Sequence, residues 1–202
     1  MATGTIDQGT VKQGDEVEVL GYNRRSKRSV AISVETFKKS LDVGETGDNI
    51  GVLLRNLPQE AIRRGMLLSQ PGQLSVFRNF QADIYVPRED EGGRKLPFKS
   101  GFKPQIYIQT ADVACQIFLP EDRKMAMQGD HLSMRGHLDR PLPIGIGTRF
   151  ALREGGKTVA SGIMTKIHPD PPEDVKEDLA RDASQLDKKK KADKDKSKDK
   201  KK

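Results

Sequence analysis

The sequence offers few residue combinations that could perform catalysis. The lone cysteine, Cys115, and the three histidines have no acid and base partners in the pattern that nucleophilic catalysis requires. His131 and His137 lie six residues apart on one predicted strand, which separates them by roughly 20 Å at about 3.3 Å per residue. They therefore cannot share a metal ion. We expect no catalytic residues and no metal site, and we expect Cys115 to pack inside a barrel.

Two short motifs imitate nucleotide-binding sites. Residues 156–158 (Gly-Lys-Thr) are similar to the end of a phosphate loop, but the glycine required five residues earlier is Ala151, and a strand pattern follows where a helix is needed. Residues 90–93 (Asp-Glu-Gly-Gly) imitate a GTPase switch without a phosphate loop or an Asn-Lys-x-Asp motif. The chain as given is predicted not to be an enzyme and to hold no cofactor.

The charge balance favours a polyanionic partner. The chain has 36 Lys and Arg against 29 Asp and Glu, a net charge of +7, and ten of the lysines fall within residues 187–202. Basic surfaces bind polyanions through counterion release. A single cysteine rules out an intramolecular disulfide and suits a reducing compartment. No apolar stretch approaches the roughly 20 residues that span a bilayer, so no membrane partner is expected.

The sequence pattern predicts that strands position these residues. Val30, Ile32 and Val34 alternate with smaller residues, which predicts that they share one face of a strand. Gly155 and Gly156 separate two strand-like runs and predict a tight hairpin. Further alternating runs cover residues 80–86, 106–108, 113–119, 132–138, 150–154 and 159–167.

Short strands without helical crossovers predict an all-β fold, with two antiparallel β-barrels in tandem. The first barrel is expected over residues 1–72 and the second over residues 73–168, divided at the Gln-Pro-Gly-Gln of residues 70–73. Residues 58–64 could form one helical turn. Residues 169–202 carry almost no apolar side chains and are expected to form a disordered Lys/Asp-rich tail.

Several segments of the sequence carry the signatures of a known protein family. Residues 3–19 resemble the Gly-x-Val-x-x-Gly signature in the second domain of translational GTPases. The segments that narrow the resemblance to elongation factor Tu are residues 33–42, 47–55 and 63–72 in the first half, and residues 90–98, 101–107 and 149–159 in the second. The resemblance runs from Met1 to about residue 167 and leaves only the tail outside it.

The resemblance implies that a GTP-binding domain, with its GTP and magnesium, precedes these two domains in relatives, together with the first strand of the second domain. The chain is therefore expected to be a fragment, a truncated gene model or the product of a split gene. The missing strand should leave an open edge in the first barrel. Residues that stack on the terminal adenine in relatives would also lie before Met1.

The resemblance also implies a pocket for the aminoacylated 3′ end of tRNA. Glu35 would flank the terminal adenine, Phe37 and Lys38 would line the ester end, and Asn49 would hold the α-amino group through its backbone. Relatives commonly have Arg at position 38, and Lys keeps the charge but loses the planar fork. Without the resemblance, Phe37 would be read as barrel core, with Glu35 and Lys38 as solvated neighbours.

In the second barrel the resemblance implies a site for the T-stem of tRNA. The positions that correspond to it are Arg94, Lys95, Gln105, Arg140, Glu154 and Gly155. Contacts to phosphate and ribose give affinity without sequence preference, which suits a carrier of many tRNAs. Relatives often have a hydroxyl where this chain has Ala114. Without the resemblance, Arg94 and Lys95 would be read as ordinary solvated surface.

Three hypotheses follow from the sequence. The first is a binding module that carries aminoacyl-tRNA to the ribosome, with a nucleotide exchange factor and a GTP-binding domain, upstream or in trans, as further partners. The second is the C-terminal part of an intact GTPase, and the third is a structural barrel protein that has lost tRNA delivery. The bacterial-type resemblance and the Lys-rich tail favour a mitochondrial location, with bacterial cytoplasm or plastid as alternatives.

Overall fold

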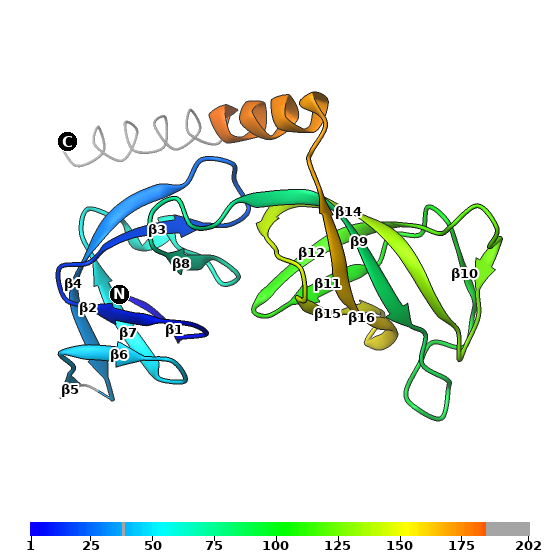
Figure 1. Cartoon of the computed structure of the whole chain (residues 1–202), viewed down its shortest axis with the longest axis horizontal. Coiled ribbons are helices and arrows are strands. Elements are labelled where there is room, and N and C mark those ends of the chain that lie inside the picture. The colour runs from blue at the N-terminus through cyan, green and yellow to red at the C-terminus, as the bar shows by residue number, and fades with distance from the viewer. Residues whose placement is uncertain (38, 185–202) are drawn as a thin grey trace, which may run out of the picture. The chain divides into compact units, whose positions relative to one another are not determined.

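The computed structural model describes residues 1–37 and 39–184. The chain divides into two compact units, each with its own strands (Figure 1). The first unit comprises Met1–Leu20 and Ser26–Ser75. The second comprises Gly21–Arg25 and the chain from Val76 onward. The short stretch Gly21–Arg25 thus belongs to the second unit, although it lies between two strands of the first.

The first unit is built from eight short strands and one turn of 3-10 helix. Five strands pair in the order β1-β7-β4-β3-β8, β5 pairs with β4, and β2 pairs only with β6. In the described residues this pairing follows an open path with β1 and β8 at its ends, as in a barrel with an open edge. The elements are β1 Ala2–Thr5, β2 Thr10–Lys12, β3 Glu16–Leu20, β4 Lys27–Thr36, β5 Lys39–Ser40, β6 Val43–Glu45, β7 Asn49–Leu54, η1 Gln59–Ala61 and β8 Leu67–Ser69.

A bulge in β4 overturns one expectation from the sequence. Ala31 and Val34 are buried, whereas Ile32 is 38% exposed. The register with β7 shifts between Ala31 and Ser33, and an extra residue at a bulge reverses which side chains face inward. Simple alternation over Val30, Ile32 and Val34 was therefore wrong for this strand, because a shift of one residue exchanges its two faces.

The second unit is a closed six-stranded antiparallel barrel. Its strands follow the cyclic order β11-β12-β14-β9-β16-β15, and β10 pairs with β13 beside it. This confirms the antiparallel barrel predicted from the alternating runs. The strands are β9 Val76–Tyr85, β10 Phe98–Lys99, β11 Gln105–Ile108, β12 Ala111–Phe118, β13 Met125–Ala126, β14 His131–Pro143, β15 Arg149–Glu154 and β16 Lys157–His168.

The barrel core follows the predicted alternation. In β9, Phe80, Ala82 and Ile84 are buried, and the Phe80 ring meets Phe150 edge-on with centroids 5.7 Å apart. Cys115 is fully buried, as expected, and desolvation raises the pKa of its thiol to about 12. The thiol therefore stays protonated and acts as a small apolar side chain.

The hairpin predicted at the glycine pair is confirmed. Glu154 lies opposite Lys157, and Gly155 and Gly156 connect β15 to β16 with φ of 55° and 82°. Two consecutive positive φ angles are the signature of a type I′ turn, which only residues such as glycine adopt at low cost. The β15–β16 hairpin is thereby fixed by the local sequence.

The expectation of disorder from residue 169 is wrong for the part of the tail that the structure describes. Residues 172–184 form a helix after β16 (Figure 1), and residues 185–202 lie outside the described residues. Pro172 occupies the first helical position, Glu173 and Asp174 follow in the first turn, and Arg181 pairs with Glu177 at 2.7 Å. These are favourable helix-start and side-chain pairing signals. Within the described residues, no helix is long and apolar enough to cross a membrane.

Candidate nucleic-acid interface

The first group of candidate residues lies at the turn between β4 and β5. Phe37 follows the last residue of β4 with a φ of 46°, and its side chain is 90% exposed. Phe37 is therefore not barrel core, which removes the alternative reading of this residue. Lys38, the other turn residue, lies outside the described residues. A large aromatic side chain held in a left-handed turn and presented to solvent is unusual for a residue with only a structural role.

Glu35 and Asn49 lie next to this turn. Glu35 of β4 pairs with Gly51 of β7, and the Thr36 hydroxyl donates to the backbone carbonyl of Asn49 at 3.0 Å. Ser33 donates to the Glu35 carboxylate at 3.4 Å. The fold therefore brings Glu35, Phe37 and Asn49 to one end of the β4–β7 ladder, where Phe37 is exposed and Glu35 is half-buried.

Arg94 is held in place by three interactions in the second unit. Its backbone N–H donates to the carbonyl of Thr158 at 3.1 Å, and its guanidinium pairs with Glu154 at 3.0 Å. The same guanidinium lies 4.7 Å from the centre of the Phe102 ring. A cation fixed by an ion pair and an aromatic face has little freedom to reorient, so Arg94 and Glu154 form one prepositioned polar group.

Lys95 lies beside this group but extends into solvent. Its ammonium is 3.8 Å from the Glu89 carboxylate, and its side chain is 74% exposed. The Gln128 side-chain amide donates to the backbone carbonyls of both Arg94 and Lys95 at 3.0 Å. The loop backbone is therefore fixed, while the charge of Lys95 stays accessible to a diffusing polyanion.

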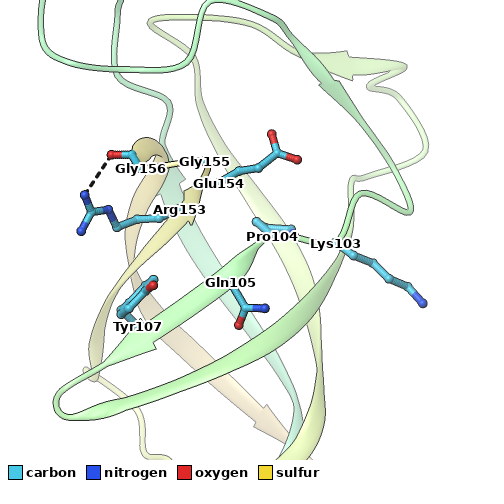
Figure 2. A pocket seen from close by; sticks show the side chains of 8 residues that line it. All are labelled: Lys103, Pro104, Gln105, Tyr107, Arg153, Glu154, Gly155 and Gly156. Atoms are coloured by element: carbon cyan, nitrogen blue, oxygen red, sulfur yellow. Dashed lines mark hydrogen bonds between the residues drawn. The ribbon is translucent and has the colours of Figure 1, made fainter.

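A pocket opens between β11 and the β15–β16 hairpin. Figure 2 shows Gln105 and Tyr107 on one strand and Arg153 on the next, with the Arg153 side chain extending toward Gly156. Gln105 lies directly opposite Arg153 in the register. Arg153 donates to the Gly156 carbonyl at 2.9 Å and lies 5.8 Å from the Tyr107 ring centre. The residues lining the pocket are Lys103, Pro104, Gln105, Tyr107, Arg153, Glu154, Gly155 and Gly156.

The structure brings four of the six second-unit candidates together. Gln105, Glu154 and Gly155 line the pocket, and Arg94 joins them through its ion pair with Glu154. Lys95 follows Arg94 on the same fixed loop. Sequence reasoning missed Arg153 and Tyr107, since only strand pairing shows that they flank Gln105. The sequence feature that could have identified Arg153 is its position immediately before the candidate Glu154 in the hairpin strand.

Arg140 lies two strands away from Gln105. Gln105 pairs with Ala114 of β12, and the next residue, Cys115, pairs with Leu138 of β14. Arg140 follows on β14 within a stretch where the register shifts between His137 and Leu142. Glu154 on β15, Gln105 on β11 and Arg140 on β14 thus lie along neighbouring strands of the barrel, and the half-buried Ala114 on the intervening β12 contributes no hydroxyl.

Comparison with known protein families gives two matches along the chain. Residues 1–69 match the model described as elongation factor Tu domain 2, and residues 73–168 match the elongation factor Tu C-terminal domain. Together the two models account for both units apart from the segment after β16.

Proposed function

The chain belongs to the elongation factor Tu family, and on this premise we propose that it binds the aminoacyl end and the T-stem of aminoacyl-tRNA for delivery to the ribosome. An elongation-factor-like role in translation follows from the two matched domains. The recognition of tRNA by the residues described above is the proposal.

The exposure of Phe37 is the observation that carries the proposal. An aromatic side chain that is 90% exposed contributes almost nothing to the first unit's core, yet it follows directly after Thr36, whose hydroxyl donates to the Asn49 carbonyl. Single-stranded RNA ends are recognised by aromatic surfaces together with hydrogen-bonding groups at base and sugar edges. We propose that Glu35 flanks the terminal adenine, that Phe37 and Lys38 line the ester end, and that Asn49 accepts from the amino group.

The second unit supplies the contacts to the stem. Arg94, Lys95 and Arg140 would neutralise phosphates, whereas Gln105, Glu154 and the Gly155 backbone would contact riboses. Such contacts fix position on a helix and carry no sequence information. A carrier that accepts many tRNAs needs affinity of this kind.

The wider setting is also a proposal. We place the chain in mitochondria, with the ribosome, a nucleotide exchange factor and a GTP-binding domain, supplied upstream or in trans, as partners. GTP and magnesium would belong to that other domain. No hydrolytic step is assigned to the residues of this chain.

Titration with charged and uncharged tRNA at two salt concentrations tests the proposal. We expect binding at low salt, a fall in log affinity that is linear in log salt, and a preference for the charged form. Binding that is absent at low salt, or that does not respond to salt, would overturn the proposal. Equal affinity for charged and uncharged tRNA would contradict the proposed aminoacyl pocket but not the proposed stem site.

A further inference from the structure

The segment after β16 docks on the second unit through buried ion pairs. Its helix, residues 172–184, presents Asp174, Asp178 and Asp182 at intervals of four residues, so that they share one face. Asp178 and Asp182 are among the few buried charged residues of the chain. A charged face that is turned inward needs charged partners.

The principal partner is Arg78 on β9, whose side chain is only 3% exposed. One nitrogen of its guanidinium lies 3.7 Å from Asp174, 3.2 Å from Glu177 and 3.5 Å from Asp178. Hydrogen bonding from Arg78 lowers the pKa of the Glu177 carboxyl. The docked segment therefore supplies the counter-charges of a buried arginine.

Asp170 anchors the start of this segment. Its carboxylate accepts from the backbone N–H groups of Arg78 and Asn79, from the Asn79 side chain at 2.9 Å and from the Arg24 guanidinium. The Asp170 side chain is 1% exposed. Both carboxylate oxygens are thus committed to donors on β9 and on the Gly21–Arg25 stretch, all within the second unit.

Arg24 forms further contacts with the acidic face of the helix. It donates to Asp178 at 2.9 Å, and its backbone N–H donates to Asp182 at 3.2 Å. Burial raises the pKa of the Asp178 carboxyl, although Arg24 and Arg78 act in the opposite direction. The arrangement therefore keeps a carboxylate in a place that costs solvation energy.

The remaining donors of Arg78 point at the strand that carries Arg140. Its Nε donates to the Leu138 carbonyl and its Nη2 to the Asp139 carbonyl, both at 2.9 Å. Arg181 of the helix donates to the same Asp139 carbonyl at 3.1 Å. These carbonyls lie at the edge of the register shift in β14, so side chains replace the ladder bonds that a regular strand would supply.

We infer that the docked segment, residues 170–182, positions Arg140 for contact with a phosphate of the RNA stem. The contacts run from the acidic face through the buried Arg78 to the two carbonyls immediately before Arg140. Arg78 and Asp170 are positioning residues, and neither touches RNA. This inference rests on the proposed function, because it deepens the role of a residue in the stem site.

The acidic segment could also have the opposite effect on RNA binding. A segment with six carboxylates could act mainly by repelling RNA from the barrel. Releasing it would then raise the affinity for tRNA. The positions of the contacts favour the first reading, because the carboxylates engage Arg24 and Arg78 rather than the pocket at Gln105.

Asp170→Asn and Glu173→Gln form a matched pair for the test. Each removes one negative charge from the same segment. Glu173 is exposed, so its replacement disturbs no buried contact. At position 170 the new amide N–H₂ would face the N–H groups that now donate to the Asp170 carboxylate. We expect Asp170→Asn to weaken tRNA binding roughly fivefold, as for the loss of one charge contact. Its plot of log affinity against log salt should lose about one unit of slope. Glu173→Gln should keep the full slope.

A double-mutant cycle with Arg140→Ala separates positioning from general destabilisation. We expect Arg140→Ala to reduce affinity and slope in the parent chain, and to have little further effect in the Asp170→Asn chain. Protection of Cys115 from a thiol reagent shows that the barrel remains folded. Asp178→Asn serves as the second variant if Asp170→Asn unfolds.

The outcomes distinguish the two proposals. If the parent chain does not bind tRNA in a salt-dependent way, the proposed function fails. If the parent binds but Asp170→Asn retains the full effect of Arg140→Ala, only the positioning role fails. An increase in affinity on Asp170→Asn that exceeds the effect of Glu173→Gln also overturns positioning, in favour of repulsion by the segment.

Discussion

Phe37 combines a left-handed backbone conformation with a solvent-exposed aromatic side chain. Its φ of 46° and its 90% exposure are both unfavourable for an aromatic side chain that serves only stability. The left-handed conformation costs roughly 1–2 kcal/mol for a residue with a Cβ, and little buried area offsets that cost. Strain of this kind is found where the surrounding structure keeps a side chain in a functional position.

Phe37→Ala tests this reading at the residue scale. We expect the free energy of unfolding to change by no more than about 0.5 kcal/mol, because the ring is exposed. Affinity for charged tRNA should fall roughly tenfold, equivalent to about 1.4 kcal/mol of lost contact, whereas affinity for uncharged tRNA should change less. Fluorescence anisotropy with both tRNA forms measures the difference.

Ile146→Ala is the matched control, since Ile146 is another large apolar residue that is 74% exposed. It lies in the second unit, outside the candidate groups. A loss of tRNA affinity in Ile146→Ala equal to that in Phe37→Ala would contradict a specific role for Phe37.

Strand β14 carries both a core contact and the candidate Arg140. A Cβ at Gly136 would overlap the ring of Phe80, whose side chain is fully buried. The absence of a side chain at position 136 thus makes room for the largest residue at the centre of the barrel. Close packing of this kind cannot relax without moving a strand.

Gly136→Ala is therefore expected to destabilise the barrel by about 1–3 kcal/mol, the usual cost of overpacking a core. Denaturant unfolding of the second unit measures the change. Gly145→Ala provides the comparison, because the nearest atom to a Cβ there is the Thr148 hydroxyl oxygen at 3.9 Å. Equal stability of the two variants would show that the barrel accommodates the Phe80 ring elsewhere.

The described residues form two core clusters of unequal size, one in each unit. The first unit has a core cluster of seven buried residues, whereas the cluster of the second unit has 23. Stabilisation scales with the apolar area removed from water. The strand pairing of the first unit is also open, whereas that of the second closes on itself. The second unit should therefore be the more stable.

We accordingly expect thermal unfolding in two steps, with the first unit melting at the lower temperature. Cys115 reports on the second step, because its thiol is fully buried and protonated and only an exposed thiolate reacts. Calorimetry combined with thiol labelling measures both events. Labelling of Cys115 that begins with the first transition would show that the two cores unfold together.

The strands and turns that depend on neighbouring residues could be predicted from the amino-acid sequence. Alternation in β9 predicted its buried face, and the Gly155–Gly156 pair predicted a hairpin. The lack of acid and base partners for Cys115 predicted that it packs inside a barrel. The quoted segments also indicated the family. Each of these features is local, because a strand face or a type I′ turn depends on a few consecutive residues.

Features that depend on residues far apart in the sequence became visible only in the folded chain. The bulge in β4 exposes Ile32. Strand pairing places Gln105 opposite Arg153 in the pocket lining. The acidic face of residues 172–184 forms ion pairs with Arg78 and Arg24. Apolar periodicity could not predict that helix, because its docked face is charged and its stability comes from partners elsewhere in the chain. Ion pairing and strand register are long-range, so the sequence names the groups and the fold determines which of them meet.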